Sequence, residues 1–176
     1  MYTPDDIMDG RVPGGEVLVF DHDHYYMGPV LALQLAAAGA RVRYVTTEGR
    51  AGAWSLFTQE QERTQRALIE LGVEIEVITS LDGFDGAEAT LACVFTGRLR
   101  RCVAAAAVLV TAREPDEALY RELVGEDGVE PEFRRIGDCQ APGLIANAVY
   151  SGHRAARELG GPTSAPRRER VLIQPA

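Results

Sequence analysis

The sequence contains no lysine, so all 18 of its permanently basic residues are arginine. A Schiff base between a carbonyl substrate and a lysine amine is therefore excluded. Aspartate and glutamate together number 26, which gives a formal net charge of −8. Because nucleic-acid binding requires a basic surface that neutralises phosphates, this charge argues against a nucleic-acid partner.

Cysteines and long apolar runs are also scarce. The three cysteines, Cys93, Cys102 and Cys139, have neither C-x-x-C spacing nor an even number, which argues against a disulfide framework or a metal cluster held by this chain alone. No apolar run is long enough to cross a bilayer, and residues 1–15 are acidic and polar, unlike a signal peptide. We expect a cytoplasmic protein without a membrane partner.

Residues 1–15 are rich in proline and glycine, and we predict that they form a linker. Residues 16–112 then begin with a β-α-β-α-β pattern, whose short glycine-containing connections predict a parallel, Rossmann-like sheet. The predicted strands are 17–21, 41–46 and 73–78, and the predicted helices are 28–39 and 57–71.

The pattern changes after residue 79. A turn-rich segment, 80–86, precedes short strands at 89–95 and 99–103 and a buried strand at 106–111. The connections are too short for crossover helices, so we predict a β-meander packed on the parallel sheet. Further along, the sequence predicts a helix at 116–123, an acidic loop at 125–132, a strand at 134–136, a helix at 144–159 and an extended tail at 161–176.

The turn after the first predicted strand lacks two glycines of the dinucleotide-binding motif. Where G-x-G-x-x-G would stand, the sequence has Asp23, Tyr25 and Gly28. Tyr25 adds bulk and Asp23 adds negative charge where the backbone would approach a pyrophosphate. An acidic residue for the ribose is also not evident, because two threonines precede Glu48. We therefore expect that this turn does not bind NAD(P).

The run from Asp21 to His24 combines carboxylates and imidazoles, both of which are metal ligands. Alternate residues of an extended segment point in opposite directions, so a capping or inter-domain hydrogen-bonding role is favoured over a metal site. His153 is interpreted as a packed or subunit-facing residue. The spacing indicates no Ser-His-Asp or Cys-His arrangement, and no catalytic residue is predicted.

Three segments together resemble the C-terminal region of the trimethylamine dehydrogenase-like flavoproteins. These belong to the branch of the Old Yellow Enzyme superfamily that also contains 2,4-dienoyl-CoA reductase and histamine dehydrogenase. The segments are VLVFDHDHYYMGPVLALQLAAAGARVRYVTT, VLVTAREPDEALYREL and IGDCQAPGLIANAVYSGHRAAREL.

The resemblance implies an α/β fold in two parts. Residues 16–112 would form the NAD-like domain, and residues 113–160 would supply the returning strand and helix of an FAD-like or ADP-binding domain. The turn at Tyr25, Tyr26 and Met27 is more similar to the amine dehydrogenases, whose NAD-like domain does not use NAD, than to the reductase.

The sequence lacks other parts that the resemblance implies: the TIM barrel with FMN, the cysteine cluster for [4Fe-4S], and the first strand and glycine loop of the FAD-like domain. An incomplete nucleotide-binding fold would expose a sheet edge and apolar surface. We therefore predict a hetero-oligomer in which a larger TIM-barrel flavoprotein subunit carries the FMN and the cluster and shares FAD or ADP with this chain.

Two groups of residues are predicted to bind that FAD or ADP. By resemblance to two-dinucleotide-domain flavoproteins, Gly137 and Asp138 would approach the cofactor, and the helix start at Gly143, Leu144 and Ile145 would offer NH groups to phosphate. The alternative for Asp138 is that it only caps the turn. The second group, Thr111, Ala112 and Arg113, resembles the Ala-Thr-Gly crossing point between the two domains, with alanine in place of the usual glycine.

Three functions remain open from the sequence. The leading hypothesis is a small subunit of a flavin-dependent amine dehydrogenase or demethylase, which stabilises the assembly and helps to complete the FAD or ADP site while electrons leave through the partner's iron-sulfur cluster. The first alternative is an NAD(P)H-dependent enoyl reductase subunit that passes hydride to FAD. The second alternative is a scaffold module without a cofactor.

Overall fold

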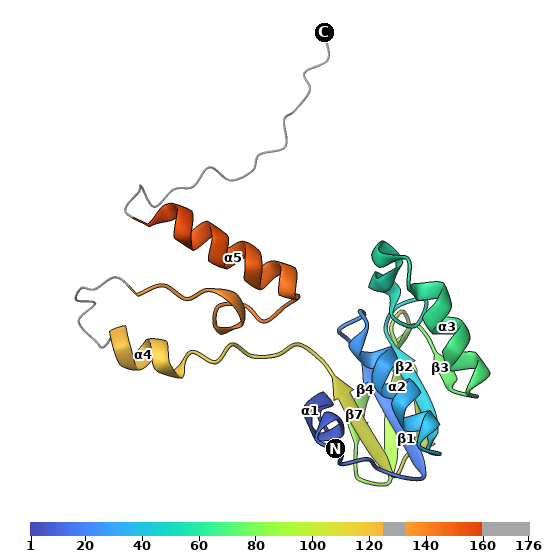
Figure 1. The fold of residues 1–176 in the computed structure, drawn as a ribbon. Helices are drawn as coiled ribbons and strands as arrows, with labels where there is room; N and C mark the ends of the chain where they lie inside the picture. Colours follow the sequence, from blue (N-terminus) through green and yellow to red (C-terminus); the bar gives the residue numbers. More distant parts are fainter. Residues whose placement is uncertain (125–132, 160–176) are drawn as a thin grey trace. The chain divides into compact units, whose positions relative to one another are not determined.

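The computed structural model describes residues 1–124 and 133–159. The chain divides into two compact units, unit 1 (Met1–Ala112) and unit 2 (Arg113–Ala176) (Figure 1). The predicted acidic loop at 125–132 and the predicted tail at 161–176 lie outside the described residues.

A four-stranded parallel sheet forms the centre of unit 1. Its strands lie in the order β3-β2-β1-β7, and every neighbouring pair is parallel. The predicted Rossmann-like sheet is therefore confirmed. Its strands are β1 (Glu16–Asp21), β2 (Arg41–Thr46), β3 (Glu74–Glu76) and β7 (Ala106–Val110).

Helices cover one face of this sheet. Alternate residues of a strand point to opposite faces, so Val17 and Val19 of β1 pack beneath the helices, together with Leu31 and Leu35 of one helix and Leu68 of another. The helices are α1 (Pro4–Met8), α2 (Met27–Ala37) and α3 (Gln61–Glu70).

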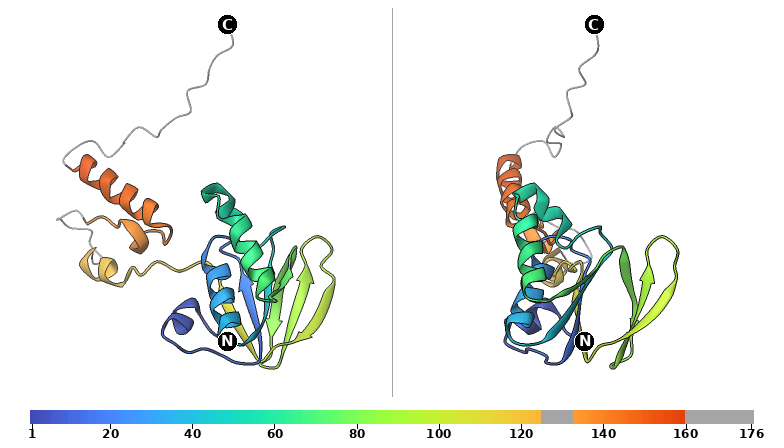
Figure 2. Two further views of the ribbon diagram at one scale, coloured as in Figure 1. Left: turned by 45° about the vertical axis from the view of Figure 1, so that its right-hand side comes forward. Right: turned by 90° about the vertical axis from the view of Figure 1, so that its right-hand side faces the viewer.

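An antiparallel sheet covers the opposite face (Figure 2). The intervening residues of β1, Leu18 and Phe20, pack against Ala89 and Leu91 of this sheet. The predicted β-meander is confirmed for the strands at 89–95 and 99–103, whereas the predicted strand at 106–111 joins the parallel sheet beside β1. The prediction of a turn-rich segment at 80–86 is wrong, because most of it belongs to the first strand of the meander, with an irregularity between Leu81 and Gly83. The strands are β4 (Thr79–Phe84), β5 (Glu88–Cys93) and β6 (Leu99–Val103).

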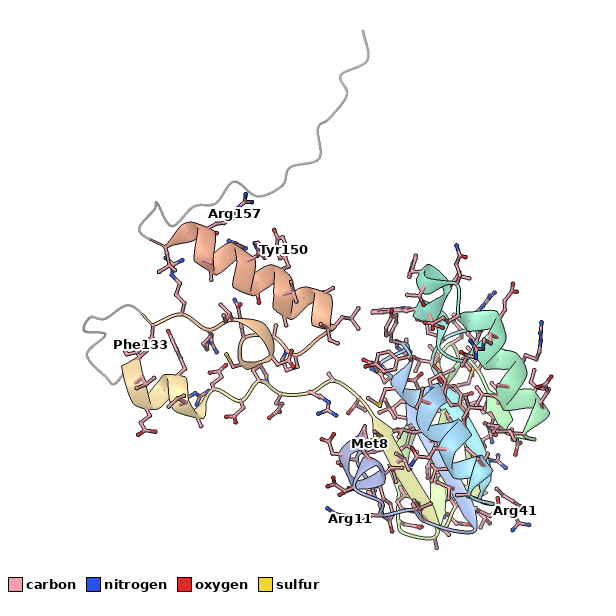
Figure 3. The ribbon with its side chains drawn as sticks, in the orientation of Figure 1. Met8, Arg11, Arg41, Phe133, Tyr150 and Arg157 are labelled. Atoms are coloured by element: carbon pink, nitrogen blue, oxygen red, sulfur yellow. The ribbon has the colours of Figure 1, made fainter. Side chains whose placement is uncertain are left out.

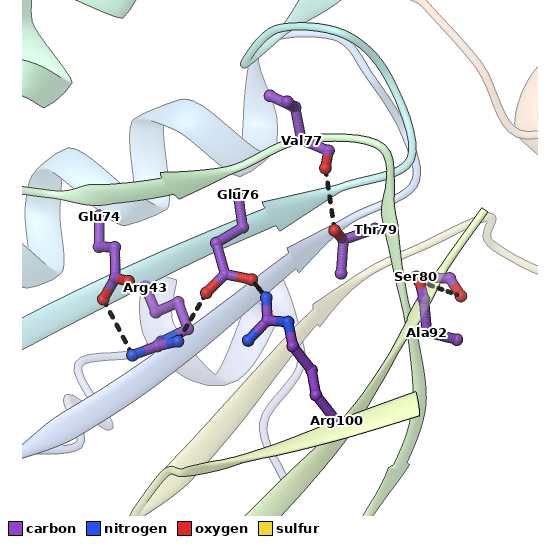
Figure 4. Close-up of polar contacts among 8 residues, drawn as sticks. All are labelled: Arg43, Glu74, Glu76, Val77, Thr79, Ser80, Ala92 and Arg100. Carbon is purple, nitrogen blue, oxygen red and sulfur yellow. Dashed lines mark hydrogen bonds and ion pairs between the residues drawn. The ribbon is translucent and has the colours of Figure 1, made fainter. Parts of the chain in front are cut away.

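A group of ion pairs involves β2, β3 and β6, and one of these pairs joins the two sheets (Figure 4). Arg43 of β2 lies 2.9 Å from Glu74 and 2.6 Å from Glu76, both of β3. Glu76 also pairs with Arg100 of β6. Because the Glu76 side chain is only 13% exposed, its charge is partly desolvated and its interactions with the two arginines are screened less than those of a surface pair.

The prediction that residues 1–15 are a linker is wrong. Tyr2 adds to the sheet edge through hydrogen bonds with Ala107 and Leu109 of 2.8 and 2.9 Å. Thr3 and Asp6 then form a capping box at the start of α1, which satisfies two amide groups of the first turn. Ile7 is fully buried in the helical layer. The segment is ordered because this apolar residue and the helix cap outweigh its glycines and prolines.

The predicted helix at 57–71 is two helices. A 3-10 helix, η1 (Ala53–Thr58), is separated from α3 (Gln61–Glu70) by Gln59, whose backbone is left-handed with a φ of 64°. A left-handed residue cannot continue a right-handed helix, so η1 ends at that point.

Unit 2 contains α4 (Ala118–Val124), η2 (Gly137–Cys139) and α5 (Ile145–Glu158). The prediction of a strand at 134–136 is wrong for this chain: Ile136 has an extended backbone, but no strand is formed there. A strand requires a hydrogen-bonded neighbour, and the described residues of unit 2 supply none. None of these residues is buried. Among the helices of the described residues, none has the length and apolar character needed to cross a membrane.

Candidate functional site

The turn between β1 and α2 binds a carboxylate from its own chain. Asp21 is fully buried, and one of its oxygens accepts hydrogen bonds from the backbone N–H groups of Asp23 (3.1 Å) and His24 (3.0 Å). The Tyr44 hydroxyl donates to the other oxygen. Amide groups that would face a phosphate in a dinucleotide-binding turn are therefore already bonded to Asp21. The predicted capping role is confirmed for this residue.

Burial shifts the pKa values of both Asp21 and Tyr44. Desolvation raises the pKa of Asp21, and the hydrogen bond from Tyr44 partly offsets that rise. Burial, followed by the negative charge of Asp21, raises the pKa of Tyr44. Tyr44 is thus held as a neutral donor.

Gly28 is required by the close approach of α2 to this carboxylate. A Cβ atom at Gly28 would lie 2.5 Å from the Cγ atom of Asp21, a distance that real Cβ atoms do not reach. The remaining glycine of the motif therefore serves helix–strand packing, which is also its role in dinucleotide-binding turns.

The loop before η1 closes over the same turn. The Gly52 N–H donates to the Tyr44 hydroxyl (3.1 Å), and the Trp54 N–H donates to the carbonyl of His24 (2.8 Å). Gly52 has a φ of +54°, and a Cβ atom there would lie 2.9 Å from the carbonyl oxygen of Tyr25. Sequence reasoning missed Tyr44 and Gly52. The signal that could have found them was a tyrosine in a buried strand, because a buried hydroxyl requires a partner.

The side chain of His24 lies beside the carboxyl end of β2. Its backbone is left-handed, with a φ of 63°, and the residue is buried. The ring nitrogens lie 3.4 Å from Thr46 Oγ1 and 3.5 Å from Thr47 Oγ1, and the ring lies 5.0 Å from His22 and 5.8 Å from Trp54 between centroids. In the part of the chain that the structure describes, no three His, Cys, Asp or Glu side chains gather in a way that could hold a metal ion.

The predicted segment at Gly137 to Ile145 forms a tight turn before α5. Gly137 has a φ of +61°, and its N–H donates to Ser151 Oγ at 2.7 Å. Asp138 accepts a hydrogen bond of 3.4 Å from the Gly143 N–H, so the carboxylate does cap the turn. At Leu144, which precedes the first residue of α5, no described side chain caps the helix. The first amide groups of α5 are thus available to an anion, and the cofactor role of these residues stays a prediction.

The second predicted segment lies where the two units join. Thr111 and Ala112 follow β7 and end unit 1, and Arg113 begins unit 2. The His22 N–H donates to the carbonyl of Val110 (2.8 Å), which places the end of β7 beside the β1–α2 turn. The two predicted segments belong mainly to different units, and a cofactor role for Thr111, Ala112 and Arg113 also stays a prediction.

Comparison with known proteins identifies relatives for almost the whole chain. Residues 2–84 match the family described as the OYE-like second alpha/beta domain. Dimethylamine dehydrogenase from Hyphomicrobium sp. (strain x) is 31% identical over 182 residues, a match that covers 89% of this chain. The chain is homologous to a part of dimethylamine dehydrogenase. This result confirms the resemblance to trimethylamine dehydrogenase-like flavoproteins.

Two solved structures contain a region with the same fold as this chain. Histamine dehydrogenase from Rhizobium sp. 4-9 is 36% identical, with a TM-score of 0.87, and the match covers 99% of this chain and 29% of that one. The 6-hydroxypseudooxynicotine amine oxidase from Pseudomonas geniculata N1 is 38% identical, with a TM-score of 0.83, and the match covers 90% of this chain and 24% of that one. The dimethylamine dehydrogenase match likewise covers 24% of the relative. The chain therefore spans about a quarter of the length of the relatives that it matches.

Proposed function

We propose that this chain is a small subunit of a flavin-dependent amine dehydrogenase or demethylase. In this proposal it docks on a larger subunit that carries a TIM barrel with FMN and a [4Fe-4S] cluster, and it helps to complete a site for FAD or ADP. The observation that carries the proposal is that the described residues of unit 2 form two α-helices and a short 3-10 helix but include no buried residue.

Unit 2 exposes apolar side chains that a stable fold would bury. Helix α5 is strongly amphipathic, and isolated helices of its length gain most of their stability from packing of an apolar face. Figure 3 shows Tyr150 projecting from this helix. The most exposed apolar residues of α5 and its end are Ile145 (83%), Leu159 (77%), Tyr150 (66%) and Val149 (59%). A partner that supplies the missing strands would cover such a surface.

The residues at the start of α5 fit one wall of a nucleotide site. The uncapped amides at Leu144 and Ile145 would face a phosphate group, and the exposed carboxylate of Asp138 would accept a hydrogen bond from a sugar or ribityl hydroxyl. A bound FAD would supply a redox-active flavin, whereas a bound ADP would have only a structural role.

The closed β1–α2 turn supports an amine dehydrogenase role over an NAD(P)H-dependent reductase role. Asp21 already occupies the amide groups of Asp23 and His24 and would repel a pyrophosphate. Measurable NADH or NADPH affinity in the assembled complex would reverse this ranking.

Nucleotide analysis of the complex tests the proposal. The chain would be co-purified with the larger flavoprotein subunit, and nucleotides released by denaturation would be identified by mass spectrometry. We expect FAD or ADP in the wild-type complex and about tenfold lower nucleotide affinity in Asp138→Asn, because a charge-assisted hydrogen bond is lost. Asp116→Asn is the matched control, since Asp116 is also exposed in unit 2 and also accepts a backbone N–H, that of Ala118.

The alternatives give different results. A complex without FAD or ADP would leave the scaffold function. A chain that remains alone, as a stable monomer that does not bind the larger subunit, would contradict the subunit proposal itself.

A further inference from the structure

Two segments that meet near the carboxyl ends of the parallel strands of unit 1 carry exposed apolar side chains, and the hydrogen bond from the Trp54 N–H to the His24 carbonyl joins these segments. We call these side chains the edge cluster: Tyr26 (48% exposed), Trp54 (52%), Leu56 (52%) and Phe57 (86%). Tyr26 precedes α2, and the other three residues belong to η1. Exposed groups of large apolar side chains on one face mark interaction surfaces.

The backbone beneath the edge cluster is fixed. The Trp54 N–H donates to the carbonyl of His24 (2.8 Å), and the Ser55 hydroxyl, which is buried, donates to the carbonyl of Gly52 (2.6 Å). The His24 ring also contacts the Trp54 ring. Because the supporting backbone is already ordered, the loop would lose little conformational entropy when a partner buries these side chains. Tryptophan and tyrosine are also the residue types that contribute most at interface centres.

The connectivity of the chain indicates what covers this surface. All four strands of the sheet are parallel, so the carboxyl end of β7 lies at the same edge as the edge cluster. The His22 N–H bonds to Val110 at the end of β7, and unit 2 begins three residues later, at Arg113. A partner polypeptide that binds unit 2 is therefore held close to this edge, because only a few residues of the chain separate the two. This tethering gives the partner a high effective concentration at the edge cluster.

We infer that the edge cluster is a second docking surface for the larger flavoprotein subunit, with an apolar complementary surface on that subunit. The inference rests on the proposed function. The relatives support it, because in dimethylamine dehydrogenase the matching region is 24% of one longer polypeptide. A dinucleotide is not needed at this edge, because Asp21 and His24 already fill the turn beneath it.

Trp54 is the only tryptophan of the chain, so it can report on its own surface. The chain would be labelled with 5-fluorotryptophan and titrated with the unlabelled larger subunit while the single fluorine resonance is followed. We expect the fluorine resonance to shift when the complex forms. The difference between its chemical shifts in H₂O and in D₂O should then disappear. Phe57→Ser should weaken the complex by about tenfold or more, since an anchor residue is lost from the interface.

Ile69→Ser is the control variant. Ile69 is 61% exposed on α3, and its carbonyl accepts the N–H of Gly72 just before β3 begins, at the opposite end of the sheet. Isoleucine and serine have similar helix propensities. This variant should bind the larger subunit as the wild type does.

The outcomes separate this inference from the function on which it rests. If the complex forms but Trp54 keeps its solvent dependence and Phe57→Ser binds normally, the inference is overturned and the subunit function stands. If no complex forms, both are overturned. If Trp54 becomes protected when the chain alone is concentrated, the surface binds a second copy, and the inference is again overturned.

Discussion

The two units use apolar residues in opposite ways. Every buried hydrophobic residue among those described belongs to unit 1, where helices and an antiparallel sheet cover both faces of the parallel sheet. In unit 2 the described residues include amphipathic α5 but no buried residue. Burial of apolar surface is the main source of folding free energy. Unit 1 therefore has the means to fold alone, whereas unit 2 has apolar side chains suited to a surface outside itself.

The largest loss of stability in unit 1 is expected from Gly28→Ala. The added methyl group would collide with Asp21, whose side chain is held by three hydrogen bonds. We expect the free energy of unfolding in urea to fall by about 3 kcal/mol. Gly49→Ala is the control, because a Cβ atom there would have open space around it, and it should change stability by less than about 0.5 kcal/mol. Equal effects at the two glycines would contradict the packing role of Gly28.

Tyr44→Phe should have the next largest effect. It removes a donor to the Asp21 carboxylate and leaves the N–H of Gly52 without its acceptor. We expect a loss of about 2 kcal/mol in the free energy of unfolding. Because the tyrosine hydrogen bond lowers the pKa of Asp21, the variant should also raise that pKa further, which an NMR titration of the carboxyl group would measure. An unchanged pKa would show that Tyr44 does not act on Asp21.

Glu76→Gln tests the two ion pairs of Glu76, of which the pair with Arg100 joins the two sheets of unit 1. The substitution removes the charge that faces both Arg43 and Arg100, and we expect a loss of about 1 kcal/mol in urea unfolding. Glu74→Gln changes a carboxylate that binds the same Arg43 but is 59% exposed, so it should cost less than about 0.5 kcal/mol. A larger loss from Glu74→Gln would contradict the role assigned to partial burial.

The smallest effect is expected in unit 2. Ile145→Ser should change the urea stability of the isolated chain by less than about 0.5 kcal/mol, because Ile145 is 83% exposed. Leu35→Ala in unit 1, where the side chain is fully buried, should cost about 3 kcal/mol in the same assay. A marked loss from Ile145→Ser would show that unit 2 has a core of its own, and the comparison between the units would fail.

Much of unit 1 could be predicted from local patterns. The apolar residues from Val17 to Phe20 predicted β1, and the glycines near positions 28 and 39 bounded α2 to within two residues. Helix α1 was predictable in principle, because Thr3 and Asp6 have the spacing of a capping box, but the surrounding glycines and prolines favoured a linker. The predicted strand at 134–136 does not form, because its neighbouring strands were expected from a partner subunit and the described residues of unit 2 supply none.

The candidate site depended more strongly on long-range contacts. The missing glycines indicated a turn unlike a dinucleotide-binding one, yet nothing local linked Asp21 to Tyr44, 23 residues away, or Tyr44 to Gly52. These partners meet because Asp21 ends β1 and Tyr44 lies in the neighbouring parallel strand. Pairing of distant strands follows from the sheet order, which hydrophobic periodicity does not specify.

The sequence by itself determined the β-α-β-α-β order of the first part of unit 1, the absence of lysine chemistry and the resemblance to amine dehydrogenases, because these depend on residue identity and on short-range periodicity. Only the tertiary structure decided that the first turn is closed by its own carboxylate and that the apolar residues of unit 2 find no core among the residues described. Those results depend on which surfaces meet, and burial is a property of the assembled layers rather than of any one segment.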